Sequence, residues 1–576
     1  MTREGATLSL TQSLFTSVVM NEESTPLSLQ LNSYESFNQP LSFEPKETRK
    51  YQDFIQDLDF FLTKVYFFHQ RSGLLCILLD QLLFLLQFVF VLLLSLFLLN
   101  GIDFNRLFDG QHKTWSDVIL PWSSWQLSSL QILLITLSSL YFLYKSIRFL
   151  RSLQVNLSIK AFYFDVGVRD VASYSWNQVL QRILSHQHLV LLQERPLTEL
   201  EVVARITRFD NYVLSLLDRG LIPVHFTVFG LHLTHLTEGF LWNLKFLLFR
   251  FPFDPFFENS WRLNEAVRSI DFESKFRRNC LILGIVNLVL CPLILLFIVV
   301  NSFFSYADSV KRDPAAFGTR CWSCFARIFC RHLNELEHSL QKRLDRAFKS
   351  TTQFMDSFQD PLLRLLARHV LFVSSAVLAV CLGLTVYDED TLRLNHMLTL
   401  ITGLTGVAAV AKSFAGDSLL PHKLSQQQLF QQTRARLHYL PDNARSRQVM
   451  ATLLQYRVSL LLETILSPLT TPFLLFCLRN KSREVCDFFR SFTVNVDSVG
   501  DVVSFSLLQG QRPLRTQLSL VHFKLENPEW TASAQQSDFL EFVRQGAHEQ
   551  QVEVEDVDDL ELQMTRSTLF LERQQT

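Results

Sequence analysis

Long runs of apolar residues constrain this chain more than any other feature. Leu74–Leu99 is 26 residues long and carries a single charge, Asp80. About 20 apolar residues are enough to cross a hydrocarbon core roughly 30 Å thick. Further apolar runs lie at 127–144, 281–300, 369–386, 394–411 and 459–478. The sequence therefore predicts an all-α integral membrane protein, because helices satisfy their own backbone hydrogen bonds in lipid.

The composition excludes several classes of function. The 576 residues have a mean hydropathy of +0.16 and a formal net charge of −1, so the chain lacks the basic surplus of a nucleic-acid-binding protein. Neither a glycine-rich phosphate loop nor a Ser/His/Asp set or paired-carboxylate site stands out. We therefore expect no catalytic residues, no cofactor and no enzyme chemistry.

Charge around the first two runs predicts their orientation. Lys/Arg cluster before the first run and after the second, whereas the loop at 100–126 has only two, Arg106 and Lys113. Because cytosolic flanks carry the positive excess, we expect a transmembrane hairpin at 51–151 with spans at about 74–99 and 127–144. Residues 1–50 are polar and are predicted to be a disordered cytosolic N-terminus.

The third run is predicted to enter the membrane without crossing it. If 281–300 crossed, the following residues 301–368 would be lumenal with eleven Lys/Arg, against the positive-inside tendency. Gly284, Asn287 and Pro292 favour a bent, re-entrant hairpin. Residues 301–368 are then a basic helical region in the cytosol.

Residues 369–411 are predicted to form a second transmembrane hairpin around an acidic lumenal connector. The run at 459–478 contains Glu463, Pro468 and Pro472 and is predicted to be a second re-entrant segment. The chain would then have four transmembrane helices and two re-entrant segments, with both termini in the cytosol. The remaining regions are predicted as cytosolic helices (152–280 and 412–458), a strand-bearing cytosolic C-terminal segment (479–531) and an acidic disordered tail (532–576).

Two groups of residues could in principle bind a metal. Cys321, Cys324, Cys330 and His332 have spacings that suggest zinc or, for the first two, a redox pair. A helix across this stretch would point Cys321 and Cys330 in different directions, so we favour ordinary packing. His232, His235 and Glu238 would share a helix face, but no further ligand accompanies them. We expect no metal site at either place.

Several stretches resemble the autophagy-related protein nine family, and their sequences look closer to those of animal members. They occur in family order: YSWNQVLQRIL (174–184), LTELEVVARITRFDNYVLSLL (197–217), FFSYADSVKRDPAAFGTRCWS (303–323), HLNELEHSLQKRLDRAF (332–348), LTVYDEDTLRLNHMLT (384–399), LLETILSPLTTPFLLFCL (461–478) and SLVHFKLENPEW (519–530).

The resemblance implies a domain-swapped homotrimer that scrambles phospholipids without ATP during autophagosome formation. It implies that the protein works with autophagy-related protein two, a lipid-transfer protein, and with other autophagy initiation factors. It also implies residence in the preautophagosomal structure, cytoplasmic vesicles, the trans-Golgi network and endosomes. A membrane scaffold that recruits the autophagy machinery remains the alternative, while a channel or solute transporter lacks support because no inverted repeat is visible.

The same resemblance suggests which residues handle lipid. Lys311, Arg312 and Asp313 match the basic-acidic triplet of the family's pore, and Thr402 matches a pore-facing position. From spacing alone, the basic pair could equally be a topology anchor. Tyr34 and Phe37 in YESF have the spacing of a tyrosine sorting motif read by clathrin adaptors.

Overall fold

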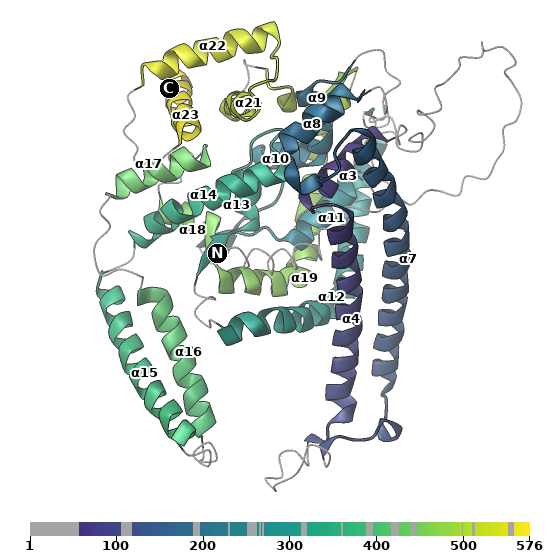
Figure 1. Cartoon of the computed structure of the whole chain (residues 1–576), viewed down its shortest axis with the longest axis vertical. Coiled ribbons are helices and arrows are strands. Elements are labelled where there is room, and N and C mark those ends of the chain that lie inside the picture. The colour runs from purple at the N-terminus through teal and green to yellow at the C-terminus, as the bar shows by residue number, and fades with distance from the viewer. Residues whose placement is uncertain are drawn as a thin grey trace, which may run out of the picture. The chain divides into compact units, whose positions relative to one another are not determined.

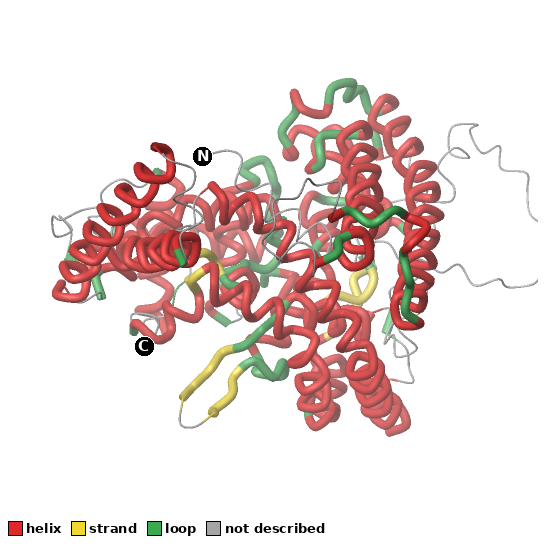
Figure 2. The backbone as a smooth tube through the Cα atoms, turned by 90° about the horizontal axis from the view of Figure 1, so that it is seen from below, coloured by secondary structure: helices red, strands yellow, loops and turns green. Residues whose placement is uncertain are grey.

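The protein is described by a computed structural model. The described residues are 57–104, 118–187, 196–228, 231–249, 262–263, 267, 270–312, 319–358, 361–387, 396–415, 425–438, 440, 446–497, 499–509, 513–550 and 558–575. They divide into two compact units, residues 57–206 and residues 207–575. Both consist mainly of helices, and the strands are short (Figure 2).

The first unit contains the predicted transmembrane hairpin. Its elements are α3 (Leu58–Gln70), α4 (Leu74–Leu96), the π-helix η2 (Phe97–Gly101), the 3₁₀ helix η3 (Trp122–Ser124), α7 (Ser129–Asp165), the 3₁₀ helix η4 (Val171–Ser173), α8 (Trp176–Ser185) and α9 (Glu199–Ile206). Helices α4 and α7 lie side by side (Figure 1). Both predicted spans are therefore helical, and α7 continues well beyond residue 144.

Aromatic packing and one buried ion pair hold the base of this hairpin. Phe61 on α3 packs edge-on against Phe162 at the end of α7, with ring centroids 4.9 Å apart. The Asp59 carboxylate accepts a hydrogen bond from the Arg205 guanidinium at 2.6 Å, and both side chains are buried. Because Arg205 lies on α9, this contact ties α9 to the start of the hairpin.

The second unit has a longer series of elements. They are α10 (Arg208–Asp218), β1 (His225–Val228), β2 (Leu231–Thr234), α11 (Glu238–Phe249), α12 (Ile270–Arg312), β3 (Arg320–Trp322), α13 (Cys324–Phe329), α14 (Glu337–Asp356), α15 (Pro361–Tyr387), α16 (Met397–Ala415), α17 (Gln426–Leu437), α18 (Arg447–Leu453), β4 (Leu454–Tyr456), α19 (Arg457–Asn480), α20 (Ser482–Phe492), β5 (Thr493–Val496), β6 (Gly500–Val503), η10 (Ser504–Leu507), α21 (Leu514–Glu526), α22 (Ala534–His548) and α23 (Asp559–Gln575). The strands form antiparallel pairs, β1 with β2, β3 with β4 and β5 with β6.

The expectation that residues 281–300 bend back as a hairpin is wrong. They form the middle of α12, a continuous 43-residue helix that contains Pro292. A Cβ added at Gly284 would lie 2.6 Å from the Phe476 ring of α19, so this glycine permits close helix packing rather than a turn. Residues 459–478 likewise lie within the single helix α19, which packs along α12. A partial entry of these two helices into the membrane remains a prediction.

Five described helices are long and apolar enough to cross a membrane, and α16 is a shorter apolar helix. Their burial within the single chain separates them into two groups. The most apolar windows of α4 with η2, α7 and α15 are 0%, 6% and 11% buried, whereas those of α12 and α19 are 22% and 33% buried. Which of these helices span the membrane and which enter it partially stays a prediction.

The predicted second hairpin is present, since α15 and α16 pack against each other (Figure 1). The predicted strands of residues 479–531 occur as the β5–β6 hairpin, but helices α20 and α21 occupy much of this segment. A hairpin, β1–β2, also interrupts the region that we expected to be wholly helical at 152–280.

The predicted disordered tail at 532–576 is wrong for its described residues. Helices α22 and α23 fold against α21 around one buried apolar cluster, formed by Leu518, Val521, Val543, Met564, Phe570 and Leu571. The acidic residues of this segment suggested disorder, but apolar residues recur at helical spacing on either side of them. Burial of these side chains offsets the entropy lost on ordering.

We predict that Met564→Ala loosens the C-terminal helices. Met564 is fully buried in this cluster, and truncating a buried methionine typically costs about 2–5 kcal/mol. Limited proteolysis of the full chain should therefore cleave α22 and α23 sooner in the variant. Gln563→Ala, at an exposed neighbouring position, is the matched control. Equal protease resistance in both variants would contradict the packed tail.

Candidate functional site

The predicted basic pair lies at the end of the long apolar helix. Lys311 and Arg312 are the last residues of α12, and the apolar run of this helix ends at Val300. Twelve further residues at 1.5 Å each carry the helix about 18 Å past that point, so the basic pair lies well beyond the apolar run. Asp313, Tyr34 and Phe37 lie outside the described residues.

Thr402 lies on α16 and is exposed in the single chain. Its hydroxyl donates a hydrogen bond to the Leu398 carbonyl oxygen at 2.8 Å, so the polar group is satisfied within the helix. Thr399, Gly403 and Gly406 are exposed on the same side, three to four residues apart. A Cβ added at either glycine would meet no described atom within 4 Å. The side of α16 that carries Thr402 therefore has small side chains, some of them polar.

Polar contacts join α11 to the paired helices α12 and α19. The Asn287 amide of α12 donates a hydrogen bond to the Asn243 side-chain oxygen of α11 at 2.9 Å. The His235 ring shares a 3.0 Å hydrogen bond with the Thr470 hydroxyl of α19. Such contacts satisfy polar side chains inside an apolar layer, where an unpaired group would be costly.

The second candidate metal group is not formed in the way its spacing suggested. His232 lies in strand β2, His235 follows the strand, and Glu238 begins α11. The three residues therefore do not share one helix face, because the β1–β2 hairpin replaces the expected helix. His235 instead pairs with Thr470 of α19.

The cysteine group is also divided between elements. Cys321 lies in β3, Cys324 begins α13, and Cys330 follows that helix. Burial raises the pKa of the Cys330 thiol to about 11, which keeps the free thiol protonated near neutral pH. His332, the fourth candidate ligand, faces other histidines instead.

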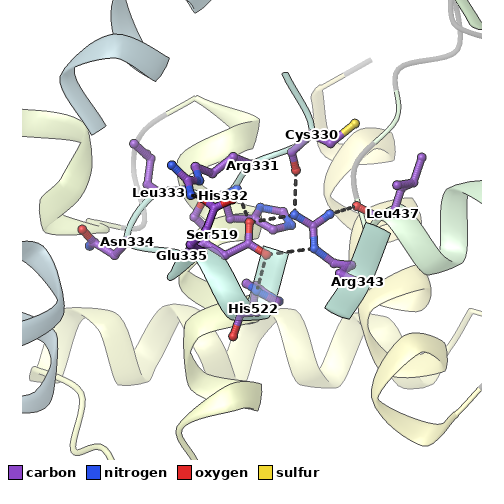
Figure 3. A network of polar contacts seen from close by, with 12 residues as sticks. Cys330, Arg331, His332, Leu333, Asn334, Glu335, Arg343, Leu437, Ser519 and His522 are labelled. Carbon is purple, nitrogen blue, oxygen red and sulfur yellow. Dashed lines mark hydrogen bonds and ion pairs between the residues drawn. The ribbon is translucent and has the colours of Figure 1, made fainter. Parts of the chain in front are cut away.

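A buried polar network surrounds His332 (Figure 3). The Arg343 guanidinium on α14 donates hydrogen bonds to both oxygens of Glu335, at 3.0 and 2.7 Å, and one to the Cys330 carbonyl oxygen at 2.7 Å. It also hydrogen-bonds the Leu437 carbonyl oxygen at the end of α17. Burial alone would raise the pKa of the Glu335 carboxyl, but the Arg343 charge holds this pKa well below its usual value. The pair is therefore ionised at neutral pH.

Three histidines meet beside this ion pair. His332 follows α13, His438 ends α17 and His522 lies in α21. One ligand-type nitrogen from each lies within 4.8 Å of the others, and all three side chains are buried. Sequence analysis missed His438 and His522 because 106 residues separate His332 from His438 and 84 more separate His438 from His522, so no local spacing connects them.

Comparison with known proteins identifies the family of this chain. The family described as "Autophagy protein ATG9" matches residues 51–509. This chain belongs to that family. Autophagy-related protein 9B of Mus musculus is 38% identical over 564 residues, covering 88% of this chain and 61% of the mouse protein. Autophagy-related protein 9A of Homo sapiens is 34% identical, covering 85% of this chain and 65% of the human protein.

A solved structure supports the same assignment. The cryo-EM structure of Schizosaccharomyces pombe Atg9 superimposes with a TM-score of 0.59 at 26% identity, covering 79% of this chain and 99% of that one. The chain spans about three-fifths of the length of the mouse and human relatives it matches. Membership of the autophagy protein 9 family supports a role in autophagy, and the apolar helices mark a membrane protein.

We predict that Glu335→Gln destabilises this autophagy protein 9 family member strongly. The substitution leaves the buried Arg343 charge without its counter-ion, and breaking a buried pair from one side typically costs about 3–5 kcal/mol. Thermal unfolding in detergent, followed by tryptophan fluorescence, should show a lower midpoint. Asp487→Asn breaks the exposed Arg490 pair and should cost at most about 1 kcal/mol.

The direction of this pKa shift determines how the stability of the protein changes with pH. Because the folded-state pKa of Glu335 is depressed, its stabilising contribution is present at neutral pH and is lost as acidification passes below the ordinary glutamate range. The variant should lose this part of the pH dependence. Equal midpoints for Glu335→Gln and Asp487→Asn would contradict the proposed role of the network.

Proposed function

We propose that this protein is an ATP-independent phospholipid scramblase that acts in autophagosome formation. Lipid scrambling needs a path along which a polar headgroup crosses while the acyl chains stay in lipid. Membership of the autophagy protein 9 family supports the process in which this activity would serve. No enzyme chemistry is required, because a scramblase only lowers the barrier to a downhill exchange.

The exposed side of α16 is the observation that carries this proposal. Thr399, Thr402, Gly403 and Gly406 follow one another at helical spacing on a helix that is otherwise largely apolar. Small residues leave space beside the helix backbone, and threonine hydroxyls offer polar contacts within it. A headgroup moving along this side would meet fewer apolar side chains than on any uninterrupted leucine-rich face.

The basic pair at the end of α12 supplies the second element of the path. Lysine and arginine bind phosphate through charge-assisted hydrogen bonds. Lys311 and Arg312 end a helix whose apolar run reaches Val300, and cations are favourable at a helix C-terminus. They would hold phosphate at the membrane face before the headgroup enters the bilayer, and Asp313 would complete the polar end of the path.

The assembly and partners belong to the same proposal. We propose that three copies form a domain-swapped homotrimer, and that the protein works with autophagy-related protein two and other initiation factors. The proposed locations are the preautophagosomal structure, cytoplasmic vesicles, the trans-Golgi network and endosomes, with both termini cytosolic. Tyr34 and Phe37 would direct sorting by clathrin adaptors.

Thr402→Trp should slow scrambling about tenfold or more, because an indole would fill the space beside Gly403 and Gly406. An added barrier of about 1.4 kcal/mol already has this effect on a rate. The rate is measured with fluorescent phospholipids and dithionite in liposomes. Thr136→Trp is the matched control, since Thr136 is also exposed on an apolar helix and bonds its own Ile132 carbonyl oxygen at 2.8 Å. Equal rates for both variants would remove α16 from the path.

Replacing Lys311 and Arg312 with glutamine and Asp313 with asparagine should also slow scrambling about tenfold, since a charge-assisted hydrogen bond is worth about 1.5–3 kcal/mol. The control removes the same number and sign of charges from exposed positions on α14, at Lys342, Asp345 and Lys349. Both proteins are compared at equal oligomer size and reconstitution yield. An unaltered rate in the first variant would reduce the basic pair to a topology anchor.

A membrane scaffold is the second candidate function. The folded helices α21, α22 and α23 form a packed group that lies outside the apolar helices and could present a surface to other proteins. Removal of α22 and α23 should then abolish recruitment of autophagy factors while leaving scrambling in liposomes unchanged. Loss of scrambling in that variant would favour a single, inseparable function.

A further inference from the structure

Three imidazole rings from distant parts of the chain are gathered at one buried point. The ring centroids of His332 and His522 are 4.6 Å apart, and those of His438 and His522 are 5.2 Å apart. His332 and His438 complete the triangle at 6.2 Å. One ring nitrogen from each lies within 4.8 Å of the other two. Burial of each side chain is nearly complete, with 1–4% exposed.

Most of the nitrogens in this cluster lack hydrogen-bond partners among the described residues. Both ring nitrogens of His332 and of His522 and Nδ1 of His438 are buried without one. The nearest carboxylate oxygen to His522 is Oε1 of Glu335, 3.5 Å from Nε2, which is too long for a well-formed hydrogen bond. Buried polar atoms are normally paired, so five such atoms in one cluster require an explanation.

The unpartnered ring nitrogens are the atoms that could donate lone pairs to a metal. A neutral imidazole has one nitrogen with a free lone pair, and this is the form that binds metal. Two carboxylates, Glu335 and Glu526, lie 3.5 and 3.7 Å from His522 Nε2 and supply negative charge beside the cluster.

We propose that His332, His438 and His522 bind one zinc ion. Three histidine nitrogens suit zinc, and a water molecule would complete a tetrahedral site. Glu335 would then act behind His522, accepting from Nε2–H and leaving Nδ1 for the metal, as carboxylates do beside metal-bound histidines. This proposal does not depend on lipid scrambling.

The ion would act as a cross-link within the second unit. His332 follows α13, His438 ends α17 and His522 lies within α21. Arg343 already links Glu335 to the end of α17, and Ser519 of α21 accepts a hydrogen bond from the Leu333 N–H. Metal bound only to the folded chain adds its binding free energy to stability. The site shares His332 with the cysteine motif of the sequence but uses none of its thiols.

The first experiment measures metal in the full-length wild-type protein. The chain is purified in detergent through a tag that involves no metal-affinity resin, and zinc is counted by inductively coupled plasma mass spectrometry. We expect about one zinc per chain, with an X-ray absorption spectrum that shows nitrogen and oxygen ligands only. A protein that binds no zinc, even after zinc is added and excess removed, overturns the proposal. Sulfur ligands would overturn it in favour of the cysteines.

The second experiment locates the site. His522→Gln and His438→Gln should each lower bound zinc to less than about a fifth of the wild-type amount, because losing one of three protein ligands sharply weakens a zinc site. His548→Gln changes an exposed histidine at the end of α22 and should keep the full amount. Zinc retained at full amount by both cluster variants would overturn the assignment.

A stability measurement on the wild type covers the case in which a cluster variant fails to fold. Removing zinc with a chelator should lower the unfolding midpoint by several degrees, and added zinc, but not magnesium, should restore it. An unfolding midpoint that does not respond to chelation or to zinc would contradict the cross-link.

Discussion

The lack of water in the hydrocarbon core of a bilayer is the constraint on which this structure depends. Backbone N–H and C=O groups must be paired within each membrane segment, so each apolar run forms a helix. The described apolar segments obey this rule, including α12 and α19, which keep helical structure through Pro292, Pro468 and Pro472. The short strand pairs lie outside these apolar helices. Helix packing, rather than sheet topology, therefore determines where the polar residues of the chain can meet.

The apolar helices fall into two groups that differ in how much of each is buried within the single chain. Helices α4, α7 and α15 leave few residues of their apolar windows buried, which suits contact with lipid or with other copies of the chain. Helices α12 and α19 pack against each other and against α11, where Asn287 and Asn243 form a hydrogen bond. His235 and Thr470 form a further hydrogen bond in this group. The proposed path for a moving headgroup lies on the exposed Thr402 side of α16 rather than at the packed α12–α19 contact.

Sequence predicted the membrane character, the apolar runs and the family resemblance, because these depend on local composition and on ordered motifs. Prediction from the sequence failed where contacts between residues far apart in the chain determine the local structure. Gly284 suggested a bend, yet it makes room for Phe476, a contact across almost two hundred residues. Acidic residues near the C-terminus suggested disorder, yet Met564 and Val543 pack on α21. His332 was considered with nearby cysteines, whereas its neighbours in space are His438 and His522. Local spacing could not predict any of these pairings.

The central claim is that the chain alone moves phospholipids between leaflets. The most direct test reconstitutes the purified wild-type protein without ATP into liposomes that carry a fluorescent phospholipid in both leaflets. Dithionite then bleaches only the outer leaflet, and a headgroup crosses lipid alone very slowly, so protein-free vesicles retain about half of their signal. We predict that bleaching continues well past that level in vesicles that contain the protein. Bleaching that stops at the protein-free level in those vesicles would contradict the account.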